Sequence, residues 1–380
     1  GDSLLDIVSS TFDTRGPMRF FRNNGDGTFT KADEAGISGS GCWGDFDNDG
    51  DLDIITASDS NILYGGGVRI DSNNYNGSFT MVYFDPHRFP RSVDCADMNG
   101  DGWTDIVFAS FDDLLLRLAV PDKPFEFHPI VTVQAVTRSQ VIIIADMNSD
   151  GWPDIVTWEM VATEDVLVFL NFLNTTSTFD RLVLRSDPGF TPLVADIAVD
   201  DMDRDGALDV VVTTSTAVYW IRNMHGNETM FSDPILIGNC PRNVYSVDVG
   251  DVTGDGMPDV AAISYQGNVA VVFANNGSSS FDVLAEVSAY RGFTIVLADV
   301  NLDGNVDVTY SPWARIGCLP HQSMGRCHRS SPMSPHSPAL PTKTPCSASG
   351  FATLSATRSA GLSLQVSSTS ASGLARRCGR

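Results

Sequence analysis

Apolar residues, from the start of the chain to about residue 312, occur in short runs bounded by polar or glycine-rich turns. The runs recur in a cycle of about 50 residues: one run ends at a long acidic loop, two runs follow it, and a polar turn leads to a fourth. The third run is clearest at residues 166–170, 217–221 and 269–273. Asn-Gly turns, as at Asn76 and Asn276, are strong hairpin signals between such runs. The pattern predicts four short antiparallel strands in every cycle.

A nine-residue acidic loop marks each cycle. Oxygen-bearing side chains occupy its positions 1, 3 and 5, glycine occupies position 6, and aspartate occupies position 9. Six loops fit this pattern and begin at Asp45, Asp97, Asp146, Asp201, Asp251 and Asp299. A shortened copy, from Asp2 to Asp6, lies at the start of the chain. Regular spacing on this scale predicts a repeat architecture.

Four short antiparallel strands per repeat are typical of β-propeller blades, so the predicted fold is all-β with four-stranded antiparallel blades. One blade cannot cover both faces of its sheet, and neighbouring blades must therefore stack around a ring. Complete blades are predicted to begin near residues 41, 93, 141, 194 and 246. The N-terminal residues supply strands two to four of another blade, and residues 292–312 supply two strands of a last one. This indicates a seven-bladed ring truncated at both ends. The alternative is a six-bladed ring, closed by pairing the strand near residue 295 with the N-terminal strands.

The composition divides the chain at residue 312. Residues 1–312 form the predicted propeller domain. Residues 313–380 are rich in Ser, Pro, Arg and Cys and contain no Asp or Glu. This composition is typical of a disordered segment. Because the repeat pattern stops abruptly inside a repeat, an artefact of the reading frame or gene model is the other interpretation.

The formal net charge of −23 conceals an asymmetry. All 47 acidic residues lie within residues 1–307 with 16 of the 24 basic ones, which gives this part a net charge of −31. An acidic body repels nucleic acid and anionic membranes in the absence of metal. No apolar run approaches the roughly 18 residues that span a bilayer, so no membrane span is predicted. The chain starts inside a repeat and shows no signal peptide.

The loop pattern favours a calcium site. A tight turn aims positions 1, 3 and 5 at one point, and glycine at position 6 permits the bend. Position 7 is variable, as expected where the ligand is a backbone carbonyl, and the aspartate at position 9 closes the shell. A shell of oxygen ligands suits Ca²⁺ rather than Zn²⁺. No loop has the Glu at position 12 that an EF-hand requires. The alternative is that acidic Asp-Gly turns only connect strands.

Up to six Ca²⁺ sites are therefore predicted. Their expected ligands are Asp45, Asp47, Asp49, Asp51 and Asp53; Asp97, Asn99, Asp101, Trp103 and Asp105; Asp146, Asn148, Asp150, Trp152 and Asp154; Asp201, Asp203, Asp205, Ala207 and Asp209; Asp251, Thr253, Asp255, Met257 and Asp259; and Asp299, Asn301, Asp303, Asn305 and Asp307. Without metal, each loop would crowd its carboxylates together, and a bound cation would remove their repulsion.

These loops, followed by Asp-Ile-Val and then by Asn-Asn-Gly-x-x-x-Phe, resemble the VCBS and FG-GAP repeats that also build the integrin α-subunit propeller. The resemblance covers residues 1–312. The Phe-Gly and Gly-Ala-Pro motifs are missing, so the VCBS-like branch is the closer one. The resemblance implies Ca²⁺ bound by the side chains of positions 1, 3, 5 and 9 and the carbonyl of position 7. Thr253 departs from the pattern and implies a weaker site, and the shortened loop with Asp2 and Asp6 implies none.

The resemblance also implies an extracellular or cell-surface protein that acts in adhesion, or a module beside an enzyme. The expected function is a calcium-binding interaction module for a protein or glycan partner, without enzymatic activity. The alternative is a propeller of the polysaccharide lyase kind. His87, His128 and His225 lie at unrelated positions in their blades, and no nucleophile motif accompanies them. Trp103 and Trp152 could stack on sugars or pack between blades.

Further expectations concern the surface. Cys42 and Cys95 lie on opposite faces of equivalent strands, and a disulfide between them is not predicted. The four glycosylation sequons fall in the turn between the third and fourth strands, on the same face as the acidic loops, at Asn76, Asn174, Asn227 and Asn276. The links between blades, on the opposite face, carry Arg88, Arg91, Arg138, Arg242 and Arg291. These arginines either meet an anionic glycan or partner protein, or pair with nearby aspartates.

Overall fold

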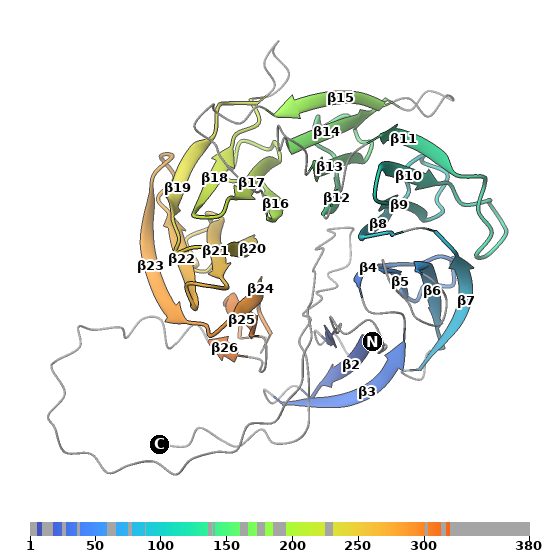
Figure 1. Cartoon of the computed structure of the whole chain (residues 1–380), viewed down its shortest axis with the longest axis horizontal. Coiled ribbons are helices and arrows are strands. Elements are labelled where there is room, and N and C mark those ends of the chain that lie inside the picture. The colour runs from blue at the N-terminus through green and yellow to red at the C-terminus, as the bar shows by residue number, and fades with distance from the viewer. Residues whose placement is uncertain are drawn as a thin grey trace, which may run out of the picture.

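Seven antiparallel sheets surround a central axis in the computed structural model of this protein (Figure 1). We number them blades 1 to 7 in chain order. The predicted all-β propeller is confirmed, since every regular element of the described residues is a strand. The described residues are 6–9, 18–24, 28–35, 39–58, 66–74, 78–87, 89–135, 139, 141–159, 166–172, 179–184, 195–224, 231–300, 303–312 and 317–319.

The strands of each blade follow one another in the chain. Blade 1 has β1 (Ile7–Ser9), β2 (Met18–Asn23) and β3 (Phe29–Ala35). Blade 2 has β4 (Ser40–Gly44), β5 (Asp53–Ser58), β6 (Gly67–Asn73) and β7 (Phe79–Asp85). Blade 3 has β8 (Ser92–Ala96), β9 (Asp105–Ala109), β10 (Asp113–Arg117) and β11 (Val131–Ala135). Blade 4 has β12 (Ile142–Ala145), β13 (Asp154–Trp158), β14 (Val166–Asn171) and β15 (Phe179–Leu184).

The remaining blades continue the same order. Blade 5 has β16 (Ile197–Asp200), β17 (Asp209–Thr213), β18 (Ala217–Ile221) and β19 (Ile235–Asn239). Blade 6 has β20 (Val244–Gly250), β21 (Asp259–Ser264), β22 (Val269–Asn275) and β23 (Phe281–Ser288). Blade 7 has β24 (Gly292–Ala298), β25 (Asp307–Pro312) and β26 (Gly317–Leu319). In blades 2 to 7 the first strand lies nearest the axis and leads into the acidic loop (Figure 1).

The described residues form seven blades, so the six-bladed alternative is wrong. β24 pairs with β25 in a sheet of its own, and β1 pairs with β2. A hydrogen bond joins blade 1 to blade 7, because Asn23 Nδ2 donates to Val300 O at 3.0 Å. The sheet of blade 7 also reaches β26, beyond the predicted domain end at residue 312. The rest of the predicted tail, residues 313–316 and 320–380, lies outside the described residues.

The hydrophobic core lies between blades rather than within one. Each of six buried clusters joins two consecutive blades; Val168 of blade 4 and Val210 of blade 5, both fully buried, share one of them. The second strands are buried along their whole length, as in β9 and β17. A strand covered on both faces favours Val and Ile over a polar–apolar alternation. Burying each such side chain contributes about 1.5–3 kcal/mol.

Aspartates near the axis connect one inner strand to the next. Asp94 Oδ2 accepts a hydrogen bond from Ile144 N at 2.9 Å, joining blade 3 to blade 4. Asp196 Oδ2 joins blade 5 to blade 6 by accepting from the next inner strand, and Asp248 Oδ2 joins blade 6 to blade 7 in the same way. Burial raises the pKa of all three carboxyls to about 7. These carboxylates therefore hold the inner strands together at the cost of desolvation.

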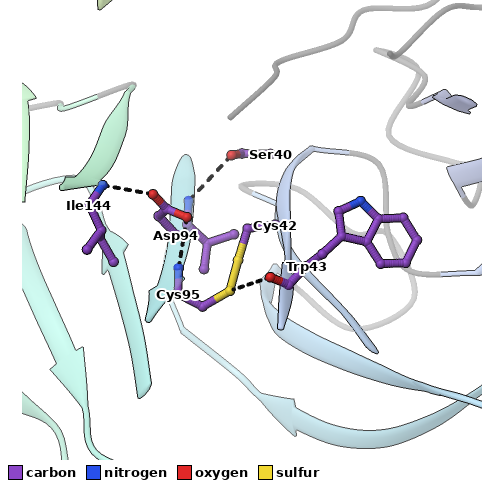
Figure 2. The surroundings of a disulfide bond; sticks show 7 residues. Ser40, Cys42, Trp43, Asp94, Cys95 and Ile144 are labelled. Carbon is purple, nitrogen blue, oxygen red and sulfur yellow. Dashed lines mark hydrogen bonds between the residues drawn. A yellow bond between two sulfur atoms is a disulfide. The ribbon is translucent and has the colours of Figure 1, made fainter. Parts of the chain in front are cut away.

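Cys42 and Cys95 form a disulfide, which the sequence reasoning did not predict (Figure 2). Cys42 lies in β4 of blade 2 and Cys95 in β8 of blade 3, with their Cα atoms 6.5 Å apart. The expectation failed because opposite faces of equivalent strands are the faces that meet where adjacent blades stack. The bond covalently joins blades 2 and 3 at their inner strands.

Candidate functional site: the acidic loops

Each acidic loop connects the first two strands of its blade. In blade 4, Ala145 pairs with Asp154 across the hairpin, so positions 1 to 8 lie outside the ladder. The residue before position 1 pairs with position 9 in the other five loops as well. The loops thus share one register, and all six are presented on the same face of the ring.

The aspartate at position 1 organises the turn. In the third loop, Asp146 Oδ1 accepts from Asp150 N at 3.1 Å and its Oδ2 accepts from Gly151 N at 2.9 Å. The bond to the glycine N–H is present in all six loops. The carboxylate at position 5 in turn accepts from the N–H of position 7 in every loop. The side chains of positions 1 and 5 are therefore held in place by backbone N–H donors of their own loop.

The glycine at position 6 is required by the backbone, as predicted. Its φ lies between 84° and 94° in all six loops, a range that side chains with a Cβ rarely adopt. A Cβ added there would meet nothing within 4 Å, so conformation rather than space selects glycine. Position 4 is also left-handed, which the sequence reasoning missed; it holds Asn48, Gly100, Ser149, Arg204 and Gly254.

The aspartate at position 9 is a buried double acceptor. Asp154 Oδ2 accepts from Met147 N at 2.8 Å, and its Oδ1 accepts from Asn171 N at 2.7 Å. It closes the loop and ties it to the third strand of the blade. Burial raises the pKa of this carboxyl, to about 6 in Asp53 and to about 7 in Asp105, Asp154 and Asp209. Each loop thus holds a desolvated carboxylate whose ionised form a nearby cation would stabilise.

Two loops bring their carboxylates within the reach of one ion. Ligand oxygens of positions 1, 3 and 9 lie within 4.8 Å of one another in the first loop (Asp45, Asp47, Asp53) and in the fourth (Asp201, Asp203, Asp209). Position 5 is not part of either group. The predicted ligand set is thus brought together in part, and coordination at all six loops stays a prediction. Asn301, at position 3 of the sixth loop, lies outside the described residues.

The donor set fits a hard divalent cation. In the described part of the chain, Asp203 Oδ1 is buried without a hydrogen-bond partner. An ion in the fourth loop would supply the interaction that this oxygen lacks. In the first and fourth loops the oxygens of positions 1, 3 and 9 would hold such an ion, and it would offset the repulsion between these carboxylates.

The fourth loop differs from the others because a side chain enters it. Arg222 Nε lies 2.5 Å from Asp203 Oδ2, and Arg222 Nη2 lies 3.1 Å from Asp205 Oδ2, so the guanidinium engages positions 3 and 5. Four other blades with an acidic loop carry shorter or apolar residues at this place: Ser72, Leu118, Leu170 and Ala274. An ion binding the fourth loop must therefore compete with a built-in cation.

Two further features of the loops were missed from the sequence. Position 2 is an apolar anchor buried beneath the loop: Phe46, Met98, Met147, Met202 and Val252 are each at most 2% exposed. In four loops the carbonyl of position 2 also accepts from the next blade, as in Asn171 Nδ2 to Met98 O at 2.8 Å and Asn223 Nδ2 to Met147 O at 2.6 Å. The signal was present in the sequence as the apolar residue at position 2 and the Asn that ends the third strand.

The other expected functional residues are dispersed. A Cβ on Gly100 would lie 2.4 Å from the Trp152 ring, so this Trp packs against the loop of the preceding blade rather than standing free. The His87 ring packs against Phe108, with centroids 5.3 Å apart, and His128 is exposed. Asn276 is exposed in its turn. His225 and the sequons at Asn76, Asn174 and Asn227 lie outside the described residues.

Comparison with solved structures places the chain among propellers. A lectin from Agrocybe aegerita, described as specifically recognising non-reducing terminal N-acetylglucosamine, aligns with a TM-score of 0.52 at 19% identity over 77% of this chain and 82% of the lectin. A putative 6-phosphogluconolactonase from Bacteroides fragilis aligns with a TM-score of 0.57 at 11% identity over 84% of this chain and 95% of its own. At these identities the likeness is one of fold. No helix in the described residues is long and apolar enough to span a bilayer.

Sequence comparison identifies the repeat. Human integrin alpha-6 is 27% identical over 146 residues, a match that covers 33% of this chain and only 12% of the integrin. Five segments match the FG-GAP-like repeat model: residues 1–56, 45–108, 97–157, 201–262 and 251–309. Most of them begin at one acidic loop and end in the strand that follows the next acidic loop. These segments cover more than half of the chain, which therefore belongs to the FG-GAP-like repeat family.

Proposed function

We propose that this chain is a calcium-loaded β-propeller that acts as an extracellular interaction or adhesion module for a protein or glycan partner. The observation that carries the proposal is the hydrogen-bond pattern that the six acidic loops share. Burying a carboxylate costs free energy, and all six loops bury one. A loop that only connected two strands would not need a buried carboxylate.

The proposed role of the metal is structural. The aspartate at position 9 joins the loop to the third strand, and the carbonyl of position 2 joins it to the next blade. An ion that satisfies the carboxylates would therefore stabilise both joints. A rigid ring can then present the turns of its opposite face to a partner, because binding affinity rises when the surface is ordered beforehand.

The extracellular assignment draws on two observations. The Cys42–Cys95 disulfide is of the kind that persists in oxidising compartments. The match to integrin alpha-6 relates the chain to an adhesion receptor, although over a small part of that protein. The exposed sequon at Asn276 would accept a glycan there.

Calorimetric melting in Ca²⁺, in Mg²⁺ and in chelator tests the proposal. A ligand that binds only the folded state stabilises it, by about 2.7 kcal/mol per site at a hundredfold excess over Kd. We expect a large rise in melting temperature with Ca²⁺ and a small one with Mg²⁺, and a reduced rise in the variant Asp146→Asn. Asp180→Asn, an exposed aspartate on the outer strand of the same blade, is the matched control. Identical melting in Ca²⁺ and chelator would refute the metal-binding role.

A further inference from the structure

Aromatic rings and two arginines gather where blade 6 meets the blades on either side, on the face opposite the acidic loops. Each member lies at the start of a first strand, in the turn between the second and third strands, or in a link between blades. We call this group the Tyr–Arg patch; it consists of Arg242, Tyr245, Tyr265, Tyr290, Arg291 and Phe293.

The turn of residues 264–268 forms the centre of the patch and holds a link on each side. On one side, Ser264 Oγ donates to Arg242 O at 2.6 Å. On the other side, Arg291 N donates to Asn268 Oδ1 at 3.0 Å, and Ala289 N donates to Asn268 O at 2.8 Å. The two arginines therefore flank one anchored turn, and their backbones are fixed.

The rings form a connected platform. Tyr265 packs against Phe293 with centroids 4.5 Å apart and against Tyr245 at 5.5 Å. The Arg291 guanidinium carbon lies 5.8 Å from the Tyr265 ring centre and 5.7 Å from that of Tyr290. Tyr290 is 64% exposed and Tyr245 is 42% exposed, although large aromatic side chains normally bury most of their area. The platform thus offers ring faces and edges to solvent.

The charge around the patch is opposite to that of the body. Residues 1–307 carry a net charge of −31, yet no Asp or Glu occurs in residues 240–247, 260–281 or 287–298. Among the described residues, neither Arg242 nor Arg291 forms an ion pair. The equivalent link before blade 3 carries Arg91, but the neighbouring turn there contains Asp112 and Asp113. The patch between blades 5, 6 and 7 is therefore a local cationic site, and beside it lies the exposed Glu286 of β23; burial and this carboxylate together raise the pKa of the nearby Cys240 thiol.

We propose that the Tyr–Arg patch binds an anionic glycan. This rests on the proposed function as an interaction module and names the ligand class of its partner. The guanidinium groups recognise sulfate or carboxylate oxygens through paired N–H donors. The exposed tyrosine rings fit the flat C–H faces of pyranose rings, while their hydroxyl groups remain in water. An acidic peptide would use the arginines but has no comparable need for exposed ring faces.

Binding of the full chain in Ca²⁺ to immobilised heparin, hyaluronan, neutral dextran and poly-glutamate tests the proposal. We expect binding to heparin or hyaluronan that weakens with salt, and none to dextran. The double variant Arg242→Gln, Arg291→Gln and the variant Tyr290→Ala should each lower glycan affinity by about tenfold or more. Arg91→Gln, at the same place in another link, should leave the affinity unchanged.

Each result decides the proposal. Glycan binding that survives in the double variant, or falls equally in Arg91→Gln, would overturn it. Binding to poly-glutamate without binding to either glycan would assign the patch to an acidic peptide and would also overturn it. These outcomes are separate from the calcium-dependent melting, which tests the metal-binding role whether or not a glycan binds.

Discussion

Reduction of the Cys42–Cys95 bond should destabilise the protein strongly. The two cysteines are 53 residues apart in the sequence, and closing a loop of that length removes about 4 kcal/mol of unfolded-state entropy at 25 °C. Reduction leaves both side chains in place, so it isolates the bond from the packing of the two buried residues. We expect a loss of about 4 kcal/mol in the free energy of unfolding on adding reductant.

Urea unfolding with and without reductant, followed by tryptophan fluorescence, measures this loss. The variant Cys42→Ala, Cys95→Ala should show little further change with reductant. Cys240, a buried free thiol, supplies the control, because Cys240→Ala should keep the full response. Peptide mapping of the unreduced protein should recover residues 42 and 95 in one linked pair. A linked pair whose reduction left the unfolding free energy unchanged would refute the reasoning from loop entropy.

Three further predictions concern the loops and the axis. Gly151→Ala should cost about 1–3 kcal/mol, since φ there is 89°, and should weaken Ca²⁺ binding measured by titration calorimetry; unchanged values would contradict the strain argument. Burial raises the pKa of Asp94 from 3.8 to about 7, so its stabilising contribution is fully present below pH 3.8 and lost as pH rises through 7. The stability of Asp94→Asn measured between pH 4 and 8 should therefore fall less steeply than that of the native chain, and parallel curves would exclude the assignment. Arg222→Ala should tighten Ca²⁺ binding at one site about two- to fivefold, whereas Arg181→Ala, which removes an outer ion pair, should not; equal effects would rule out competition by Arg222.

The repeat made much of the fold predictable. Each acidic loop predicted the hairpin that contains it, and the succession of apolar runs and turns predicted the four strands of each blade. The glycine of position 6 could be placed because only a left-handed backbone explains glycine at the same point of every loop. Local backbone geometry that recurs in every repeat is therefore the part of the structure that the sequence predicts best.

Relations between blades were harder to predict. Cys42 and Cys95 were judged as members of equivalent strands, whereas their distance depends on how the faces of neighbouring blades meet. Arg222 follows Asp205 by 17 residues, and only the third strand's position brings it over the loop. The link from Asn23 to Val300 spans 277 residues, and nothing local to either residue signals it. Contacts of this kind can be predicted only once the arrangement of the blades around the ring is known.

The residue at position 2 has a mechanical consequence in the second, third, fourth and sixth loops. Its N–H donates to the loop's own closing carboxylate, as Met147 does to Asp154, while its carbonyl accepts the amide of the following blade, as from Asn223. A cation bound to that carboxylate would therefore act on the residue at position 2, which is also hydrogen-bonded to the following blade. Loading with metal should therefore change the torsional stiffness of the whole disc. Under tension, the blades should part in steps whose force depends on how many loops are filled.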